Sequence, residues 1–153
     1  DQIDENFPLI LSTVREVGHY SCRSMTGNCP ALATLADEPG FAQMNPLDAR
    51  ELGIKDQQLV WVEGRRGKVI TRAMVTERVN RGAIYMTYQW WIGACNELTV
   101  EHLDPYSKTP EYKYSAVRVV PIEDQKWAEQ YLVQEYDRLK QRLAETADNV
   151  VAA

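Results

Sequence analysis

The chain is organised around the stretch Leu9-Ile10-Leu11-Ser12-Thr13-Val14-Arg15-Glu16-Val17-Gly18-His19-Tyr20-Ser21. Its apolar start is typical of a buried strand. Arg15, Glu16, His19 and Ser21 then follow at the point where that strand leaves the core. A buried strand that delivers such side chains to its exit loop is a common way to build a site for a polar ligand. The residues alone leave an alternative open, a solvated loop with an Arg–Glu pair.

The composition is that of one ordinary globular domain. The chain has 153 residues, of which 44% are hydrophobic and 25% are charged, with a net charge of -5. This charge disfavours nonspecific binding to nucleic acid or to anionic membranes. There is neither an apolar run long enough for a membrane span nor a signal-peptide pattern at the start. The first residue is Asp, from which we expect a domain cut or processed from a longer chain.

The three cysteines and two histidines limit metal chemistry. Cys22, Cys29 and Cys95 form no Cys-x-x-Cys pair, so they cannot by themselves build a structural zinc site or a four-thiolate iron–sulfur cluster. Reduced thiols in the cytosol explain them most simply, and we predict a cytoplasmic protein. Cys95 is interpreted as a small buried apolar residue.

Local signals place the other elements. Asn45 can cap a helix of about two turns that Gly53 closes. A short helix is expected over residues 30–36, and strands over 41–44, 58–64, 67–75, 83–88 and 114–120. Arg65 and Arg66, at the tip of the hairpin between residues 64 and 67, are predicted to face solvent. Helical periodicity runs from about 123 to 144. This order favours a small barrel or a mixed sheet.

Two adjacent tryptophans, Trp90 and Trp91, cannot both point to one face of a strand. We expect them to pack at an interface between domains rather than against a ligand.

Several motifs follow in order: Thr13-Val14-Arg15-Glu16, His19-Tyr20-Ser21, Asn45-Pro46-x-Asp48-Ala49, Leu52-Gly53-Ile54, Arg66-Gly67, Asn96-Glu97-Leu98-Thr99, Asp104-Pro105 and Tyr112-Lys113. Together they resemble the C-terminal molybdopterin-dinucleotide-binding domain of the molybdenum and tungsten bis-pterin oxidoreductases. The motifs around His19 and Trp90 are most similar to catalytic subunits of the formate dehydrogenase H type. Nitrate-reductase-like members tend to carry a second histidine where this chain has Ser21.

The resemblance implies a mainly β (α+β) fold, a six-stranded double-psi β-barrel with short helices and a C-terminal helix. The resemblance covers the barrel, over residues 9–121. From the resemblance together with the local patterns we expect a linker over residues 1–8, a helix over 122–147 that extends beyond the resemblance and packs on the barrel or on a missing domain, and a frayed tail over 148–153. The resemblance also implies a set of cofactor-binding residues: Thr13, Arg15, Glu16, His19, Ser21, Tyr88, Asn96, Tyr112 and Lys113.

The implied roles follow from side-chain chemistry. Arg15 and Lys113 would neutralise pyrophosphate or bond to pterin carbonyls, and Glu16 would accept from donor edges of a pterin or guanine. The His, Ser and Tyr residues would supply single hydrogen bonds. Two alternatives stay open: His19 as a satisfied interior histidine, and Tyr88 as a residue of the barrel core.

The implied cofactor is bis-molybdopterin guanine dinucleotide with molybdenum or tungsten. A [4Fe-4S] cluster and all catalytic residues and metal ligands would lie in upstream domains, so this chain alone is predicted to be inactive. Expected partners are those domains and the electron-transfer subunits of a formate dehydrogenase or hydrogenlyase complex, with no nucleic acid. Two other functions remain: the same domain of a nitrate-reductase-like enzyme, and a stand-alone double-psi barrel that acts as an interaction module.

Overall fold

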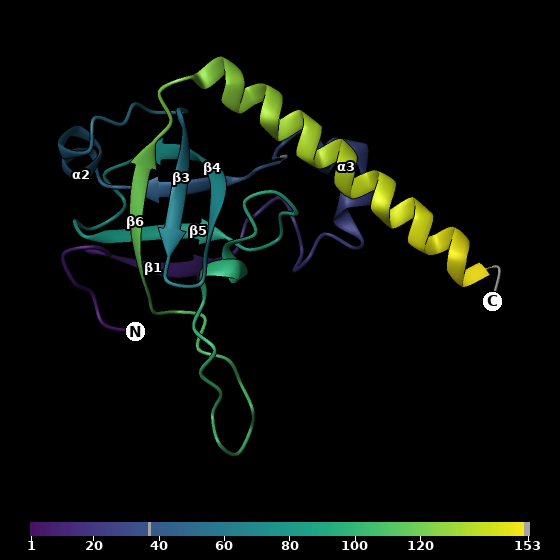
Figure 1. The fold of residues 1–153 in the computed structure, drawn as a ribbon, viewed down its shortest axis with the longest axis horizontal. Helices are drawn as coiled ribbons and strands as arrows, with labels where there is room; N and C mark the ends of the chain where they lie inside the picture. The colour runs from purple at the N-terminus through teal and green to yellow at the C-terminus, as the bar shows by residue number, and fades with distance from the viewer. Residues whose placement is uncertain (37, 152–153) are drawn as a thin grey trace.

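The structure is a computed structural model that describes residues 1–36 and 38–151. Six strands close into a barrel, and a long C-terminal helix crosses its outside (Figure 1). The elements are β1 (Leu9–Val14), η1 (Thr26–Asn28), α1 (Pro30–Ala33), β2 (Phe41–Met44), α2 (Pro46–Glu51), β3 (Leu59–Gly64), β4 (Gly67–Val75), β5 (Ala83–Thr87), η2 (Cys95–Leu98), β6 (Ser115–Pro121) and α3 (Gln125–Val151).

The strand order around the barrel is β1-β5-β2-β4-β3-β6. β1 pairs in parallel with β5, and β2 pairs in parallel with β4, whereas the other neighbours are antiparallel. Burial alternates along β1, so that Leu9, Leu11 and Thr13 point inward. Closure leaves no unpaired sheet edge. The predicted fold class is confirmed.

The parallel pairing of β1 with β5 determines where the loops gather. Ile10 lies beside Ala83 and Val14 lies beside Thr87, so both strands leave the barrel at the same end. In Figure 1 both arrows point away from α2. Because β6 runs antiparallel to β1, the segment that precedes β6 reaches this end too. We call it the exit end.

Helix α2 has the capping that its sequence predicts. Asn45 Oδ1 accepts from the Leu47 backbone N–H at 2.9 Å, and Pro46 stands at the first turn. Gly53, which closes the helix, has a φ of +69°, a conformation that glycine adopts without steric cost. The helix lies at the end of the barrel opposite to the exit end.

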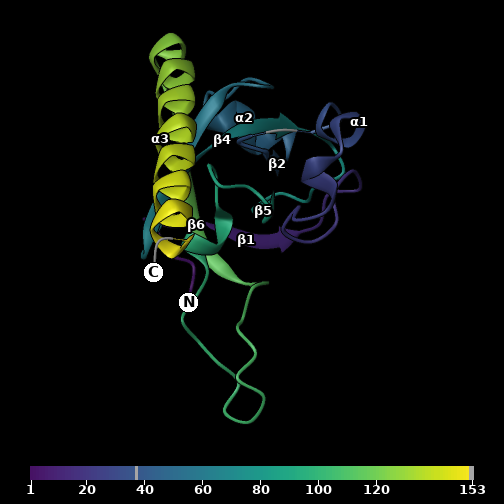
Figure 2. The ribbon, with the colours of Figure 1, turned by 90° about the vertical axis from the view of Figure 1, so that its right-hand side faces the viewer.

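Helix α3 packs on the barrel through its first half. Ala128 and Leu132 lie against an apolar cluster formed by Leu59, Ile70, Ile92 and Ile122. Gln125 fixes the start of the helix, since its side chain bonds both the N–H and the carbonyl of Leu59. Figure 2 shows the helix as one outer layer beside the strands. It continues to Val151, past residue 147, where we expected it to end. Residues 152 and 153 of the predicted tail lie outside the described residues.

The prediction that Arg65 and Arg66 face solvent holds for Arg65, which is exposed, whereas Arg66 is half-buried, and both side chains also have partners within the chain. Arg65 forms ion pairs with Asp1 and Asp4, and Arg66 bonds to Asp1 and to the Leu98 carbonyl. The side chain of Asp1 is only 7% exposed and also accepts from the Ala116 backbone N–H. The hairpin tip therefore holds the first residues of the chain against the barrel. Sequence spacing could not show this, because the partners lie about sixty residues apart.

Candidate functional site

The nine predicted ligand residues lie around the exit end but line different surfaces. We call residues 15–36 with 38–40 the first exit segment, which follows β1, and residues 88–98 the second exit segment, which follows β5. The first carries four of the predicted residues and the second carries two, Tyr88 and Asn96. Thr13 is the second-last residue of β1, and Tyr112 and Lys113 precede β6.

Thr13, Tyr112 and Lys113 form one hydrogen-bonded group. The hydroxyl of Thr13 donates to the Tyr112 carbonyl at 3.0 Å, and Lys113 Nζ donates to the Thr13 carbonyl. Thr13 is buried, whereas the other two side chains are exposed at the surface. This contact fixes the cation of Lys113 next to the point where β1 ends. Residues almost one hundred positions apart in the sequence are joined here.

Arg15 and Glu16 line a cavity of about 600 Å³ beside β2 and β4. Glu16 Oε2 is buried and has no hydrogen-bond partner among the described residues. A buried acceptor without a donor costs about 1–3 kcal/mol, more for a charged group. Arg78, from the connection between β4 and β5, lines the same cavity. The sequence did not single out Arg78, since a lone arginine in a turn carries no motif.

Asn96 and Tyr112 line a second cavity, of about 450 Å³, together with Arg66 and Glu97. Tyr112 is 40% exposed. The structure thus places four of the nine predicted residues in two separate cavities rather than in one pocket.

His19 has partners inside the chain at both ring nitrogens. Nδ1 lies 3.0 Å from the Thr26 hydroxyl, and Nε2 lies 3.1 Å from the Ala36 carbonyl. The ring is buried and lies nearly perpendicular to that of Trp90, with 5.8 Å between the ring centres. This geometry favours the interior-histidine alternative, and a direct contact of His19 with a ligand stays a prediction.

Ser21 and Tyr88 differ in surroundings. Ser21 is exposed and has a φ of 48°, a left-handed conformation uncommon for residues other than glycine. Tyr88 is half-buried and packs against the barrel core. Both stay predicted ligand residues.

The prediction that Trp90 packs between domains is wrong. Trp90 is 3% exposed and its Nε1 donates to the Thr87 hydroxyl, so it belongs to the interior of this chain. Trp91 is 47% exposed, and its ring lies 5.9 Å from that of Tyr136 on α3. The neighbouring Gln89 is buried, and its Nε2 has no hydrogen-bond partner among the described residues.

The thiols differ strongly in acidity. Burial raises the pKa of Cys95 to about 12. The pKa of the exposed Cys22 is lowered, chiefly because the Ser24 backbone N–H stabilises its thiolate. Within the described part of the chain, no cluster of three or more His, Cys, Asp or Glu side chains is placed to hold a metal ion. No described helix has both the length and the apolar character of a membrane span.

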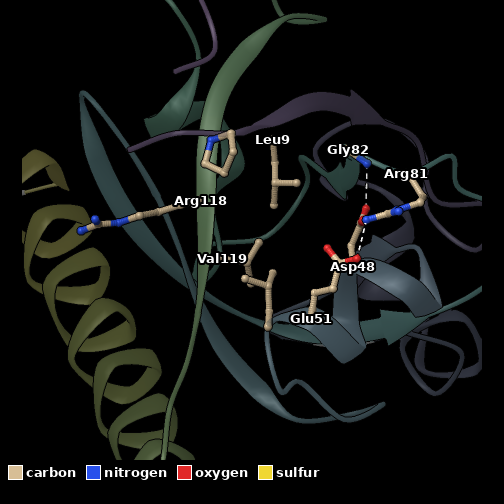
Figure 3. A pocket seen from close by; sticks show the side chains of 9 residues that line it. Leu9, Asp48, Glu51, Arg81, Gly82, Arg118 and Val119 are labelled. Carbon is tan, nitrogen blue, oxygen red and sulfur yellow. Dashed lines mark hydrogen bonds and ion pairs between the residues drawn. The ribbon is translucent and has the colours of Figure 1, made fainter. Parts of the chain in front are cut away.

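A third cavity, of about 480 Å³, lies at the opposite end of the barrel (Figure 3). Its apolar wall includes Leu9 and Val119, and Arg118 points away from it. The buried carboxylate of Asp48 accepts from Arg81 at 3.1 Å and from the Gly82 backbone N–H at 2.7 Å. Because these polar groups already bond one another, we predict the ligand site at the exit end rather than here.

The fold is a closed β-barrel domain whose exit end carries Arg15, Lys113 and Glu16, with one buried oxygen of Glu16 unpartnered among the described residues. Comparison with known proteins gives the family. Residues 9–116 match the family described as "Molydopterin dinucleotide binding domain", and the chain belongs to this family.

Several relatives are larger proteins. The chain is 68% identical to "Formate dehydrogenase H" of Escherichia coli (strain K12), over 96% of this chain and 21% of that protein. It is 45% identical to "F420-dependent formate dehydrogenase 2 subunit alpha" of Methanococcus maripaludis, over 78% of this chain and 18% of the relative. An assimilatory nitrate reductase catalytic subunit of Bacillus subtilis is more distant, at 33% identity over 76% of this chain and 16% of its own. The chain therefore spans about a fifth of the length of the formate dehydrogenase relatives.

A solved structure supports the fold. Acetylene hydratase from Pelobacter acetylenicus superimposes with a TM-score of 0.65 at 20% identity, over 76% of this chain and 18% of that one.

Proposed function

We propose that this domain holds molybdopterin guanine dinucleotide in the catalytic subunit of a molybdenum- or tungsten-dependent formate dehydrogenase. The complete subunit would interconvert formate and carbon dioxide and pass electrons to an upstream [4Fe-4S] cluster. It would act in the cytoplasm with the electron-transfer subunits of a formate dehydrogenase or hydrogenlyase complex. The observation that carries this proposal is the 68% identity to formate dehydrogenase H, which extends over almost the whole chain.

The residues at the exit end fit such a cofactor. Glu16 lines a cavity, and its Oε2 has no hydrogen-bond donor among the described residues. An N–H edge of guanine or pterin would supply such a donor. Arg15 at the same cavity offers a planar set of donors for phosphate or carbonyl oxygens. Lys113 uses one donor on the Thr13 carbonyl and keeps others for an anionic group.

The cofactor, when bound, supplies metal-centred redox chemistry. This chain contributes binding: the cations neutralise phosphate charge, Glu16 orients a ring edge, and the rigid barrel holds these groups at one end. We assign no catalytic residue to it.

The test is the cofactor content of the purified complete subunit. We expect Arg15→Ala and Lys113→Ala each to weaken cofactor retention about 10- to 100-fold, since a hydrogen bond to a charged group contributes about 1.5–3 kcal/mol. Arg118→Gln is the matched control, because its ion pair with Glu63 lies at the surface on β6 and β3. Full cofactor content in both Ala variants would contradict the proposal.

Two other functions are separated by further assays. Turnover of formate against nitrate by the complete subunit, with a dye acceptor, decides between the formate dehydrogenase and the nitrate-reductase-like enzyme. A stand-alone interaction module would use exposed Trp90 and Trp91 with the terminal helix as its partner surface. Of these two tryptophans only Trp91 is exposed, which weakens this alternative.

A further inference from the structure

A buried ion pair joins the two exit segments. Arg23, on the first segment, donates to the carboxylate of Glu38 near the end of the same segment, and the two side chains are only 12% and 4% exposed. The Glu38 oxygens also accept the backbone N–H groups of Trp91 at 2.9 Å and Ile92 at 3.0 Å, on the second segment. One carboxylate thus ties two places of the first segment to the second.

Arg23 makes a second connection across the segments. Its Nε donates to the Gln89 carbonyl at 3.0 Å, and its guanidinium carbon lies 4.5 Å from the centre of the Trp90 ring. The same ring meets His19 edge-on. Through these contacts Arg23 fixes the backbone just after Tyr88 and supports the segment that carries His19.

The two segments also approach closely, backbone to backbone at Gly93 and backbone to side chain at Gly40. A Cβ atom added at Gly93 would lie 2.5 Å from the Pro39 carbonyl oxygen, and one added at Gly40 would lie 1.9 Å from Trp90 Nε1. Such an approach leaves no room for one segment to shift alone.

A buried ion pair is an inefficient means of gaining stability, because desolvation offsets much of the attraction. Burial raises the pKa of Glu38, against the opposing effects of the Trp91 N–H and Arg23. The contacts of the Glu38 carboxylate form together only when the two exit segments take one particular position relative to each other. The arrangement is therefore selective for geometry.

We propose that the Arg23–Glu38 pair is the positioning element that sets the two exit segments relative to each other, so that the first segment and Tyr88 meet the same cofactor. Neither residue is among the predicted contacts. This inference rests on the proposed function of the domain.

The experiment uses the complete catalytic subunit, loaded with cofactor. Arg23→Gln and Glu38→Ala are compared with Val62→Ala, a cavity variant in the core of β3 that tests whether lower stability alone accounts for the effect. The readouts are the melting temperature, the ratio of pterin to folded protein, the half-life of pterin release, and the KM for formate. Arg15→Ala and Lys113→Ala serve as reference variants for binding.

We expect both pair variants to shorten the half-life of pterin release at least about tenfold, with an unchanged KM for formate in the loaded fraction. Val62→Ala should keep the wild-type half-life. The inference is overturned if the pair variants release pterin like Val62→Ala while Arg15→Ala and Lys113→Ala release it faster. If none of the variants changes release, the proposed function fails as well.

Where a pair variant does not fold, hydrogen exchange on the wild-type subunit replaces it. The Trp91 and Ile92 amides should exchange at least about tenfold more slowly in the cofactor-loaded subunit than in the cofactor-free one. Equal exchange in the two forms would overturn the inference.

Discussion

Replacing Gly40 with alanine tests how closely the exit segments pack. Gly40 has a φ of +69°, and a methyl group there would lie 1.9 Å from Trp90 Nε1. Trp90 cannot easily move, because it is 3% exposed and contacts both Arg23 and His19. The substitution therefore imposes two separate costs, one on the backbone and one on packing.

The variant Gly53→Ala is the control that separates the backbone cost from the packing cost. Gly53 has the same φ of +69°, but nothing lies within 4 Å of an added Cβ. Gly53→Ala should lose only the backbone term, about 1 kcal/mol. Gly40→Ala adds overpacking of about 1–3 kcal/mol, for a total of about 2–4 kcal/mol.

Equilibrium urea unfolding of the chain, followed by tryptophan fluorescence and far-ultraviolet circular dichroism, measures both losses. Coincident transitions by the two probes are required for the comparison. Equal losses of free energy of unfolding in the two variants would show that Trp90 does not pack against Gly40, and would refute the argument for tight apposition of the segments.

Three further predictions concern residues away from this contact. Asp48→Ala should lower the free energy of unfolding by about 1–3 kcal/mol, because the Gly82 N–H loses its acceptor, and should leave the pterin content of the complete subunit unchanged. A loss of pterin at equal stability would contradict the prediction that the ligand site lies at the exit end. Asn45→Ala should cost about 1 kcal/mol in urea unfolding through loss of the helix cap, and no measurable loss would show that this cap is dispensable. At pH 8, iodoacetamide should modify Cys22 at least about tenfold faster than Cys95, because only the thiolate reacts and the pKa is lowered at Cys22 but raised to about 12 at Cys95. Mass spectrometry of the labelled peptides measures the two rates, and equal rates would contradict the prediction.

The prediction of the fold succeeded where the signal was local. Asn45 caps α2 and Gly53 closes it within one short stretch, and glycines flank the turn of the β3–β4 hairpin. Predictions about single side chains were weaker. Trp90 was misplaced, and the partners of Arg65 and Arg66 were not predicted, because Arg23, His19 and Asp1 come near these residues only in the folded chain.

The sequence by itself determined the strands, the capped helix and the order of motifs that marks the family, since these depend on neighbouring residues and on residue order. Only the tertiary structure decided that β1 pairs with β5, about seventy residues away, and so brings both exit segments to one end of the barrel. It also decided that Arg23 and Glu38 tie these segments together, whereas no motif marks either residue. The physical reason is that a polar side chain acquires its partner through closeness in space. Around the first exit segment, which begins with Arg15 and Glu16, that closeness is created by closure of the barrel.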